Sequence, residues 1–490
     1  MTINREDNKS LLVVAFVVLL TRIPFLFSGY GSEEDAWGLI LIARNIHLSG
    51  IYEVSRMPGH PVQEYIYSLI WQWPAWCLNL ITAVVSSAGV YFFMLTVKLL
   101  LNNQSNTEIA NASSLFPQSK YGLSIPGLSG IALAFTPVFY IHSTDIMDYS
   151  WALSLVLFAC YLTVSGKYLT AGIVLGIACG FRVTAGAMVI PFAAWHYLNH
   201  KSFKSVFISG MLTLITAIIC FIPAFNIYGT SFFTYYEYFP YPPMLKNIYK
   251  GTVGAWGVLG ITAVAAAVAV FVFRWIKISA EFKKSILPAV LLCVLTIGLY
   301  SYSYLKIPQK TAFVLPMVPF IILLFALVLS EKQMKYFALS LIVSCFFLGI
   351  NLDDPLRGSK ATPLSIRTEI GNAPVAIDAL SGLVLADNSK RIQKMNYASG
   401  LVDQLHHSTE KTVIIAGWWQ NELNYFAIKN PNPLVSYLYY ADQSQLKDSI
   451  ASGNKIYFLP EQNYFNDLRF NNEFTDELAD PLNIYQFPNQ

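Results

Sequence analysis

Charged residues are scarce in this chain. Asp, Glu, Lys and Arg together make up 12% of its 490 residues, whereas a soluble domain carries about 25%. Hydrophobic residues account for 55%, and apolar runs of 15 to 25 residues recur from Leu11 to about Ile350. Helices of this length and composition span a bilayer. The composition therefore excludes a soluble globular protein and predicts a polytopic α-helical membrane protein.

The sequence also lacks the signatures of nucleotide and nucleic-acid binding. It contains no glycine-rich phosphate loop and no basic stripe, and the residues behind its net charge of +3 lie between the apolar runs. A basic surface is what attracts nucleic acid. We therefore expect no nucleic-acid partner.

Cysteine chemistry is not expected either. No CxxC pair occurs, and every cysteine lies in an apolar run with no histidine at ligand spacing. The six residues are Cys77, Cys160, Cys179, Cys220, Cys293 and Cys345. We interpret them as packing residues rather than as metal ligands or disulfide partners.

The apolar runs predict about eleven membrane crossings, two of them short. The crossings lie near residues 11–27, 77–101, 125–141, 150–166, 169–180, 185–199, 205–225, 254–273, 285–303, 313–330 and 336–350. Ile66–Trp76 is apolar and aromatic but too short to cross, so we expect a re-entrant or surface segment there.

Charges in the loops are separated by sign. The loops on the side of the N-terminus contain Lys98, Lys120, Lys167, Lys201, Lys204, Arg274, Lys277, Lys283, Lys284, Lys332 and Lys335. The opposite loops contain Glu33, Glu34, Asp35, Asp145, Asp148 and Glu237. The positive-inside rule therefore predicts a multi-pass protein of the plasma (inner) membrane with a cytoplasmic N-terminus and, after eleven crossings, an extracytoplasmic C-terminus.

The composition changes after Asn351. Lys411–Gly417, Leu434–Tyr440 and Lys455–Leu459 have the pattern of strands, and Asp442–Ala451 has the pattern of a helix. Alternating strands and helices predict a small α/β domain. We therefore divide the chain into a transmembrane module, 1–350, and an extracytoplasmic α/β domain, 351–490.

The first outer loop, residues 28–64, carries the densest group of polar signals. Ser32 is placed to cap a helix with Asp35 at its third position. An apolar face follows up to Leu48, and Gly50 ends the helix, which suits a helix lying in the membrane surface. The helix dipole favours the ionised form of Asp35. The pattern alone does not separate a functional acid from an ordinary helix-start residue.

Further charges lie next to the membrane where they need a partner or a function. Asp145 and Asp148 follow His142 at the outer end of a crossing, and Arg182 lies between two short crossings. Lys306 and Lys310 are cations on the acidic side, which suggests a bound anion. The alternatives are a solvated loop cap for either aspartate, and snorkelling or a simple ion pair for Arg182. We interpret Lys246 and Lys250, which break the trend more weakly, as residues of a solvated loop.

In this order, the motifs resemble those of the GT-C glycosyltransferases of the protein mannosyltransferase and lipid A aminoarabinose transferase type. Asp35 leads a surface helix that ends at Gly50, which is similar to the first motif of that family. Arg56 before Pro58, followed by the aromatic stretch from Tyr65 to Trp73, resembles the second.

The later motifs match as well. Asp148 fits the aspartate at the start of a crossing, with Asp145 as a close rival, and Arg182 fits the cation before a small residue. Lys306-Ile-Pro and Leu315-Pro-Met-Val-Pro resemble the last motif, but extra residues separate its halves and leave the register of Lys310 open.

The resemblance implies an inverting transfer of a hexose or pentose from a polyprenyl-phosphate donor to a hydroxyl on the outer face of the membrane. Asp35 is then the base, whereas Asp148 orients the acceptor, holds the partners of Asp35 or helps to bind a divalent metal such as Mg or Mn. The candidates for binding the donor phosphate are then Arg182, Lys306, Lys310 and Arg56. Glu34, Asp145 and His60 are accessory candidates. A glycolipid, a polysaccharide and a protein are all open as acceptors.

Three other classes compete with this hypothesis. A transporter or flippase of lipid-linked sugars would also use membrane cations, but the sequence has no inverted repeat and no matching pair of broken helices. A polymer ligase would carry its key residues in a large late loop, whereas here the rich loop is the first. A purely structural protein leaves Arg182 and Lys306 unexplained.

Overall fold

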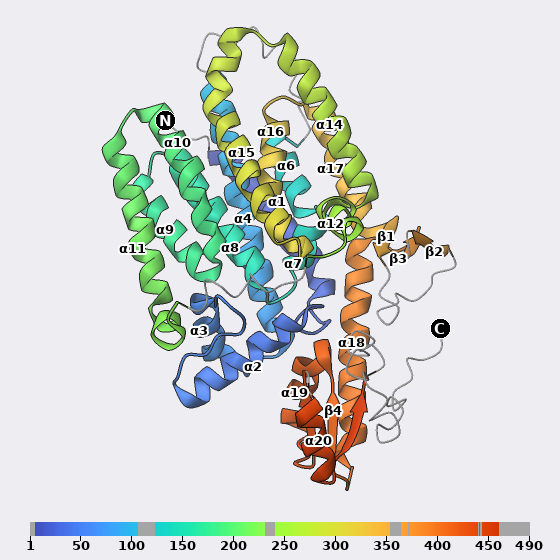
Figure 1. Ribbon diagram of the computed structural model, residues 1–490. Helices are drawn as coiled ribbons and strands as arrows, with labels where there is room; N and C mark the ends of the chain where they lie inside the picture. The colour runs from blue at the N-terminus through green and yellow to red at the C-terminus, as the bar shows by residue number, and fades with distance from the viewer. Residues whose placement is uncertain are drawn as a thin grey trace.

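The protein is described here by a computed structural model, which covers residues 5–105, 123–230, 241–352, 364–370, 373–439, 441 and 443–459. Helices form an elongated bundle, and the last strands and helices of the chain lie at one end of it (Figure 1). Lys120 and Glu237, which entered the charge pattern, lie outside these ranges, as does residue 442 at the start of the predicted C-terminal helix.

Five helices are long and apolar enough to cross a membrane. They are α1 (Arg5–Arg22), α4 (Ala75–Ser105), α11 (Phe203–Tyr228), α14 (Val258–Lys277) and α15 (Ala280–Lys306). Shorter apolar helices are α6 (Ile125–Ala134), α8 (Asp148–Val164), α9 (Tyr168–Phe181), and η5 (Thr311–Met317) with α16 (Val318–Ala326). Helix is present in each of the eleven predicted ranges, but the number of crossings stays a prediction.

The remaining helices of the bundle are short or less apolar. They are α7 (Pro137–His142), η2 (Val183–Met188), α10 (Val189–His200), α12 (Met244–Gly251), α13 (Val253–Trp256) and α17 (Glu331–Phe346). Ile23–Phe25 forms the short helix η1 after α1.

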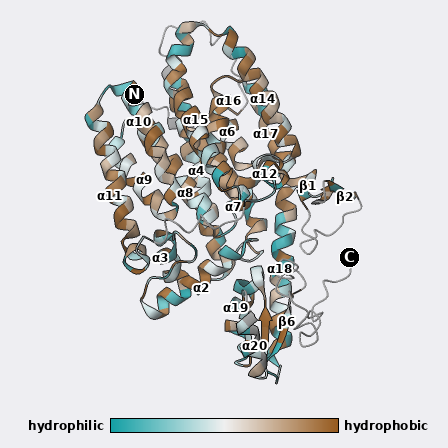
Figure 2. Cartoon of the chain, viewed as in Figure 1, coloured by the Kyte–Doolittle hydropathy of each residue, from teal (hydrophilic) through white to brown (hydrophobic). Residues whose placement is uncertain are grey.

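The bundle has a central helix and lipid-type outer helices. In α4, 61% of the most apolar window is buried inside the protein, whereas the figure is 6% in α11 and 11% in α14. The outward faces of α11 and α14 are apolar, and Figure 2 shows the hydrophobic colour concentrated on the bundle helices. Exposure of so much apolar surface to water would be energetically unfavourable. These helices therefore indicate an integral membrane protein.

Close contact between α4 and α8 fixes the start of α8. A Cβ atom placed on Gly89 would lie 2.9 Å from the Cα atom of Ser154, so only glycine allows this approach. Because Asp148 is the first residue of α8, the contact holds its carboxylate at the end of the bundle.

The first outer loop forms two helices, α2 (Glu34–Ser49) and α3 (Pro61–Ile70). Gly50 ends α2 in a left-handed conformation with φ of 71°, as predicted. The predicted cap was wrong: Glu33 occupies the cap position, and no side chain caps α2. Asp35 does not reach back to Ser32 because its carboxylate is held by Arg56 and Lys310. The segment Ile66–Trp76, predicted to be re-entrant or to lie at the surface, includes the end of α3 at Ile70 and the start of α4 at Ala75.

Two small sheets follow the bundle. The first is antiparallel in the order β1-β3-β2, with β1 (Gly349–Leu352), β2 (Ser365–Ile370) and β3 (Ala373–Asp378). The second is parallel in the order β5-β4-β6, with β4 (Thr412–Ile415), β5 (Val435–Leu438) and β6 (Lys455–Phe458). The helices are α18 (Leu383–His406), η6 (Gly417–Trp419), α19 (Gln420–Lys429) and α20 (Gln443–Ala451).

The three predicted strands and the predicted helix after Asn351 coincide with β4, β5, β6 and α20. The sequence did not predict the first sheet or the long helix α18. This helix packs against α17 and α7 of the bundle and against α19. It therefore connects the C-terminal sheets to the membrane module.

Candidate active site

Charged side chains from five separate segments meet in one cluster. The helices α2 and α3, which adjoin two of these segments, lie at one end of the bundle (Figure 1). The charged side chains come from the start of α2, the loop before α3, the start of α8, the end of α9 and the start of η5. Six residues form this cation–carboxylate cluster: Glu33, Asp35, Arg56, Asp148, Arg182 and Lys310. Its members lie up to 277 positions apart in the chain, so tertiary packing alone brings them together.

Arg56 bridges the two aspartates that the sequence singled out. Its Nη1 donates to Oδ2 of Asp35 at 2.7 Å, and its Nη2 donates to Oδ1 of Asp148. Arg182 approaches Asp148 from the other side, with 2.8 Å between its Nη1 and Oδ2. Asp148 is only 1% exposed. A carboxylate so deeply buried needs such charged partners, because desolvation alone would make its ionised form costly.

Lys310 completes the cluster. Its Nζ lies 2.5 Å from Oε2 of Glu33 and also contacts Oδ2 of Asp35. Three carboxylates therefore face three cations, and the cluster has no net formal charge. Burial raises the pKa of Asp35, but the charges of Lys310 and Arg56 lower it by more than burial raises it. The pKa of Asp35 therefore lies below its ordinary value. Asp35 is therefore ionised at neutral pH.

Aromatic rings pack against the two arginines. The guanidinium of Arg56 lies 5.4 Å from the ring centre of Tyr149, and that of Arg182 lies 4.7 Å from the same ring. Arg182 is also 4.9 Å from the ring of Phe313. The Tyr149 hydroxyl donates to Glu33 at 3.4 Å. Cation–π contacts hold both guanidinium groups in place and still leave donors for a ligand.

His60 orients Arg56. Its Nε2 accepts from Nε of Arg56 at 3.0 Å, and its Nδ1 lies 2.5 Å from the carbonyl oxygen of Phe181. Burial lowers the pKa of His60, and the nearby Arg56 lowers it further against the opposing effect of Asp148. A neutral ring with its proton on Nδ1 satisfies both contacts. This predicted accessory residue therefore contacts a cation of the cluster.

Glu34 forms none of the ion pairs found for the cluster, although it neighbours Asp35 in sequence. Burial raises its pKa to about 8, and the negative charge of Asp35 adds to the increase. Its Oε2 has no hydrogen-bond partner in the described part of the protein. Glu34 is therefore mostly protonated at neutral pH, unlike Asp35.

This difference predicts a pH dependence of stability. The pKa of Glu34 is higher in the folded protein than its ordinary value of 4.5, so the folded state binds an extra proton between about pH 4.5 and 8. The free energy of unfolding therefore decreases as the pH rises through this window. We expect Glu34→Gln to reduce the fall in apparent melting temperature between pH 5.5 and 8 by a few degrees. An unchanged pH profile would contradict the assignment.

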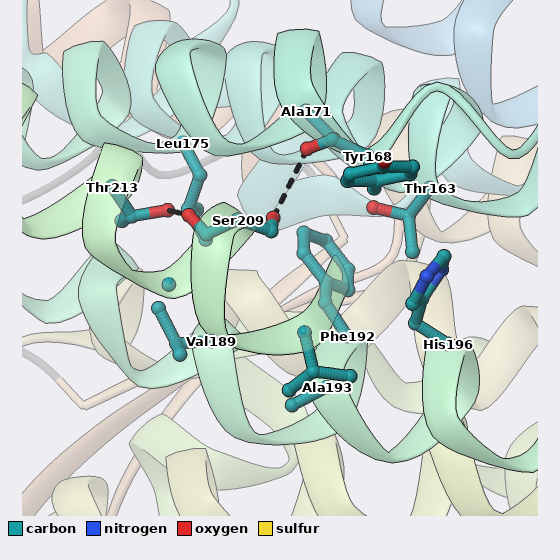
Figure 3. A pocket seen from close by; sticks show the side chains of 12 residues that line it. Thr163, Tyr168, Ala171, Leu175, Val189, Phe192, Ala193, His196, Ser209 and Thr213 are labelled. Atoms are coloured by element: carbon teal, nitrogen blue, oxygen red, sulfur yellow. Dashed lines mark hydrogen bonds between the residues drawn. The ribbon is translucent and has the colours of Figure 1, made fainter. Parts of the chain in front are cut away.

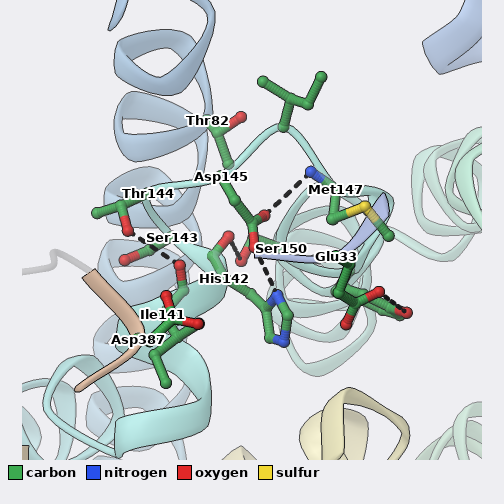
Figure 4. A network of polar contacts seen from close by, with 12 residues as sticks. Glu33, Thr82, Ile141, His142, Ser143, Thr144, Asp145, Met147, Ser150 and Asp387 are labelled. Carbon is green, nitrogen blue, oxygen red and sulfur yellow. Dashed lines mark hydrogen bonds and ion pairs between the residues drawn. The ribbon is translucent and has the colours of Figure 1, made fainter. Parts of the chain in front are cut away.

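Asp145, the rival of Asp148, pairs with His142, and Figure 4 shows this pair near Glu33 of the cluster. Its Oδ2 lies 2.8 Å from Nδ1 of His142, and its Oδ1 accepts from the backbone nitrogen of Met147 at 3.0 Å. It is close to Arg391 but contacts none of the cations of the cluster. Asp145 therefore holds the loop that precedes Asp148.

Arg391 of α18, which lies outside the membrane module, binds the loop that precedes Asp148. It is 2% exposed and donates to the carbonyl oxygens of Thr144 at 2.9 Å and Ile141 at 3.0 Å. Asp387 lies 2.6 Å from its Nε, and Asp145 lies 3.7 Å from its Nη2. Sequence analysis missed Arg391, because no local pattern identifies a buried arginine in a mostly polar helix.

The helix α19 fastens the start of α2 in a similar way. The hydroxyl groups of Tyr30 and Tyr425 lie 2.9 Å apart, and Asn421 donates to the carbonyl oxygen of Glu34 at 3.3 Å. The Trp37 ring packs against Tyr425 at 5.3 Å between ring centres. Together α18 and α19 hold both segments that present the aspartates of the cluster.

The two candidate lysines separate in space. Lys310 lies in the cluster, whereas Lys306 is exposed at the last turn of α15, with its Nζ 5.7 Å from the ring centre of Tyr302. Lys250 was expected in a solvated loop, and this is wrong. It lies in α12 and donates to the carbonyl oxygens of Pro308 and Gln309, directly before Lys310. Burial lowers the pKa of Lys250 to about 8, and Lys246 and Lys310 lower it in the same direction.

A cavity that opens to the outside begins at Arg182, and its empty space of about 310 Å³ includes this open part. Four of its lining side chains carry polar groups, and the others are apolar, among them Leu153, Val156 and Leu315; the four are Tyr149, Arg182, Thr184 and Tyr300. The cavity lies between α8, η2, α15 and η5. It therefore places a guanidinium beside a space that suits an apolar chain.

A divalent metal was left open for Asp148, and the described residues do not fit one. They contain no group of three or more His, Cys, Asp or Glu side chains placed to hold a metal ion. Asp35 and Asp148 instead face arginine and lysine groups. We therefore derive no reaction step through a metal.

Comparison with known proteins gives a match in structure but not in sequence. No protein-family model matches the chain, and no curated protein sequence matches it. A crystal structure of ArnT from Cupriavidus metallidurans bound to undecaprenyl phosphate is similar, with a TM-score of 0.54 at 11% identity over 96% of this chain and 94% of that one. The apo structure of the same protein gives a TM-score of 0.51 at 12% identity, with 94% of each chain covered.

The similarity extends over nearly the whole length of both chains, so it includes the bundle and the residues after it. The predicted resemblance to the lipid A aminoarabinose transferase type is thus confirmed for the fold. Together with the apolar helices, it indicates an integral membrane protein with a fold similar to that of ArnT.

Proposed function

We propose that this protein is a membrane glycosyltransferase that moves a sugar from a polyprenyl-phosphate donor to a hydroxyl group. The observation that carries the proposal is the cation–carboxylate cluster at the edge of an apolar cavity. A phosphate joined to a long apolar chain suits this combination of guanidinium groups and apolar surface. ArnT, which has the same fold, was crystallised with such a lipid.

The donor phosphate binds to Arg182, Arg56 and Lys310. Arg182 lines the cavity and has a guanidinium that forms planar hydrogen-bond pairs with phosphate. The cluster has no net formal charge, so a phosphate that binds there competes with Asp35 and Asp148 for the three cations. Lys306 is not needed for this step, since its ammonium contacts no member of the cluster among the described residues.

This competition makes Asp35 a base. While Lys310 and Arg56 face its carboxylate, its pKa is low and it is a poor proton acceptor. When the phosphate draws these cations away, the pKa of Asp35 rises toward its ordinary range. The catalytic base is thus activated only when the donor is bound.

The reaction is a single displacement with inversion. The acceptor oxygen forms a bond to the anomeric carbon while the bond from that carbon to the phosphate oxygen breaks. The electron pair of the broken bond stays on the phosphate, where Arg182 and Lys310 stabilise the growing charge. The proton of the acceptor hydroxyl goes to Asp35. Asp148 orients Arg56 and Arg182, which agrees with its contacts to both.

The orientation follows from the charges in the loops. Cations in the predicted inner loops place the N-terminus in the cytoplasm and the cluster on the outer face of the plasma membrane. The region after Ile350 then lies outside the cytoplasm and takes part in holding the active site. The acceptor is a hydroxyl-bearing glycolipid, polysaccharide or protein that reaches this face.

Binding of the donor lipid tests the proposal. We expect the purified protein to retain a polyprenyl phosphate in native mass spectrometry, and Arg182→Ala to weaken its binding by about ten- to a hundredfold. This range corresponds to the loss of a charge-assisted hydrogen bond of about 1.5 to 3 kcal/mol. Lys306→Ala is the matched control, because it removes an exposed cation of the same region and should leave binding unchanged.

Two results would contradict the proposal. Equal retention of the lipid by the wild type and Arg182→Ala would remove the proposed phosphate site. Movement of a labelled lipid-linked sugar across the membrane of proteoliposomes, without formation of a glycosidic bond, would instead favour the hypothesis of a transporter or flippase.

A further inference from the structure

A second cavity lies at the far end of α8 from the active site (Figure 3). Asp148 is the first residue of α8, whereas Thr163, which lines this cavity, lies in its last turn. A helix rises 1.5 Å per residue, so about 22 Å separate the two levels. The cavity lies between α8, α9, α10 and α11 and opens to the outside, and its empty space of about 360 Å³ includes this open part. It is therefore distinct from the space beside Arg182.

His196 is the unusual residue of this cavity. It is 5% exposed, and neither of its ring nitrogens has a hydrogen-bond partner in the described part of the protein. Its ring packs against Tyr168 at 5.1 Å and against His200 at 4.6 Å between ring centres. A buried polar group without a partner costs free energy. The imidazole therefore calls for a polar ligand inside the cavity.

The cavity has a polar end and an apolar wall. Figure 3 shows His196, Tyr168 and Thr163 at one end, with Val189, Leu175 and Thr213 at the other. The hydroxyl groups of Thr213 and of the nearby Ser209 donate to backbone carbonyl oxygens, whereas the imidazole nitrogens have no such partner among the described residues. The ligand that fits such a lining is amphipathic, with its polar group at the imidazole and a hydrocarbon chain along the wall.

Exposed cations surround the polar end. Lys167 directly precedes Tyr168 at the start of α9, Lys201 follows the end of α10, and Lys204 lies in the first turn of α11. Three lysines at these helix ends favour an anion over a neutral or zwitterionic group. Basic pockets between membrane helices bind anionic lipid headgroups by this means.

We propose that this cavity binds the phosphate headgroup of an anionic phospholipid in the leaflet opposite the active site. His196 donates a hydrogen bond to the headgroup, and the start of the acyl chain lies against Leu175 and Val189. The exposed lysines attract the headgroup electrostatically. This inference does not depend on the reaction proposed above, since it rests on different residues at the other end of the helices.

Lipid titration of the full-length protein tests the proposal. The detergent-purified protein is titrated with phosphatidylglycerol, phosphatidylcholine or inorganic phosphate, and bound lipid is counted by native mass spectrometry while the melting temperature is recorded. We expect phosphatidylglycerol to bind and stabilise the wild type, and His196→Leu to weaken this binding about tenfold. His196→Gln, which keeps hydrogen-bonding groups, should recover much of it. His47→Leu, which replaces an exposed histidine on α2, is the matched control.

A variant at an exposed position guards against a folding defect in His196→Leu. Lys201→Glu combined with Lys204→Glu reverses the local charge at two exposed positions and should also weaken phosphatidylglycerol binding. Equal binding of phosphatidylglycerol by the wild type and His196→Leu would overturn the proposal, as would equal binding of phosphatidylcholine. Stabilisation by inorganic phosphate alone would identify a free-anion site instead. If no lipid changes the melting temperature or remains bound, the cavity holds only water.

Discussion

Replacement of Asp35 by asparagine is expected to lower sugar transfer by about a thousandfold, within the range measured for the loss of a general base. The amide has the same shape as the carboxylate but cannot take the proton of the acceptor hydroxyl. Lys310 keeps its contact with Glu33, and Arg56 keeps its contact with Asp148. The cluster therefore stays paired, and the variant should fold and still bind the donor lipid.

The measurement uses membranes that contain the wild type or the variant, a panel of radiolabelled polyprenyl-phosphate sugars and an envelope extract as acceptor. Glu53→Gln is the matched control, because it removes a carboxylate of the same outer loop that contacts Asn45 rather than the cluster. Transfer by Asp35→Asn at more than a tenth of the wild-type rate would exclude Asp35 as the base. Loss of both transfer and lipid binding would show that the residue organises the site instead.

Much of the fold follows from the sequence because a bilayer leaves the backbone few options. Each apolar run must form a helix to satisfy its own peptide groups, and every predicted range contains one. The number of crossings does not follow in the same way. Whether a short helix such as α9 crosses the membrane depends on its tilt and on the helices packed against it. Hydropathy predicts neither of these.

The candidate site was predicted best where a charge sits beside an apolar run. Asp148 and Arg182 lie at the ends of apolar helices. Because burying an unpaired charge there is costly, each position predicts a polar or charged partner. The structure joins them at 2.8 Å. The lysines were harder to place, because α15 extends as far as Lys306 and leaves that residue exposed. Where a helix ends depends on its tertiary contacts.

The C-terminal contribution to the site could not be read from the sequence. Arg391 and Lys394 are both buried in α18, a helix whose sequence mixes polar and apolar residues throughout. Apolar periodicity therefore does not reveal which face is buried. Their partners Thr144 and Glu422 are distant in the chain, so only the fold identifies them.

The buried pair of Lys394 and Glu422 makes the largest stability prediction. The two side chains form an ion pair between α18 and α19, with 3% and 0% exposure. Glu422→Leu leaves the ammonium of Lys394 buried without its partner, which costs about 3 to 5 kcal/mol in such pairs. We therefore expect a clear loss of melting temperature in detergent and a larger share of inactive protein.

A double variant separates the lost pair from simple misfolding. Lys394→Met with Glu422→Leu removes both charges and replaces them with apolar side chains of similar size, so most of the lost stability should return. The control is Glu410→Gln, which breaks the exposed pair with Lys455 in the same region and should change the melting temperature little. If the double variant melts no higher than Glu422→Leu alone, packing rather than the unpaired charge explains the loss. If it melts like the wild type and also regains transfer, the contact between α18 and α19 is needed to hold Asp35 and Asp148 in place, but its charges are not.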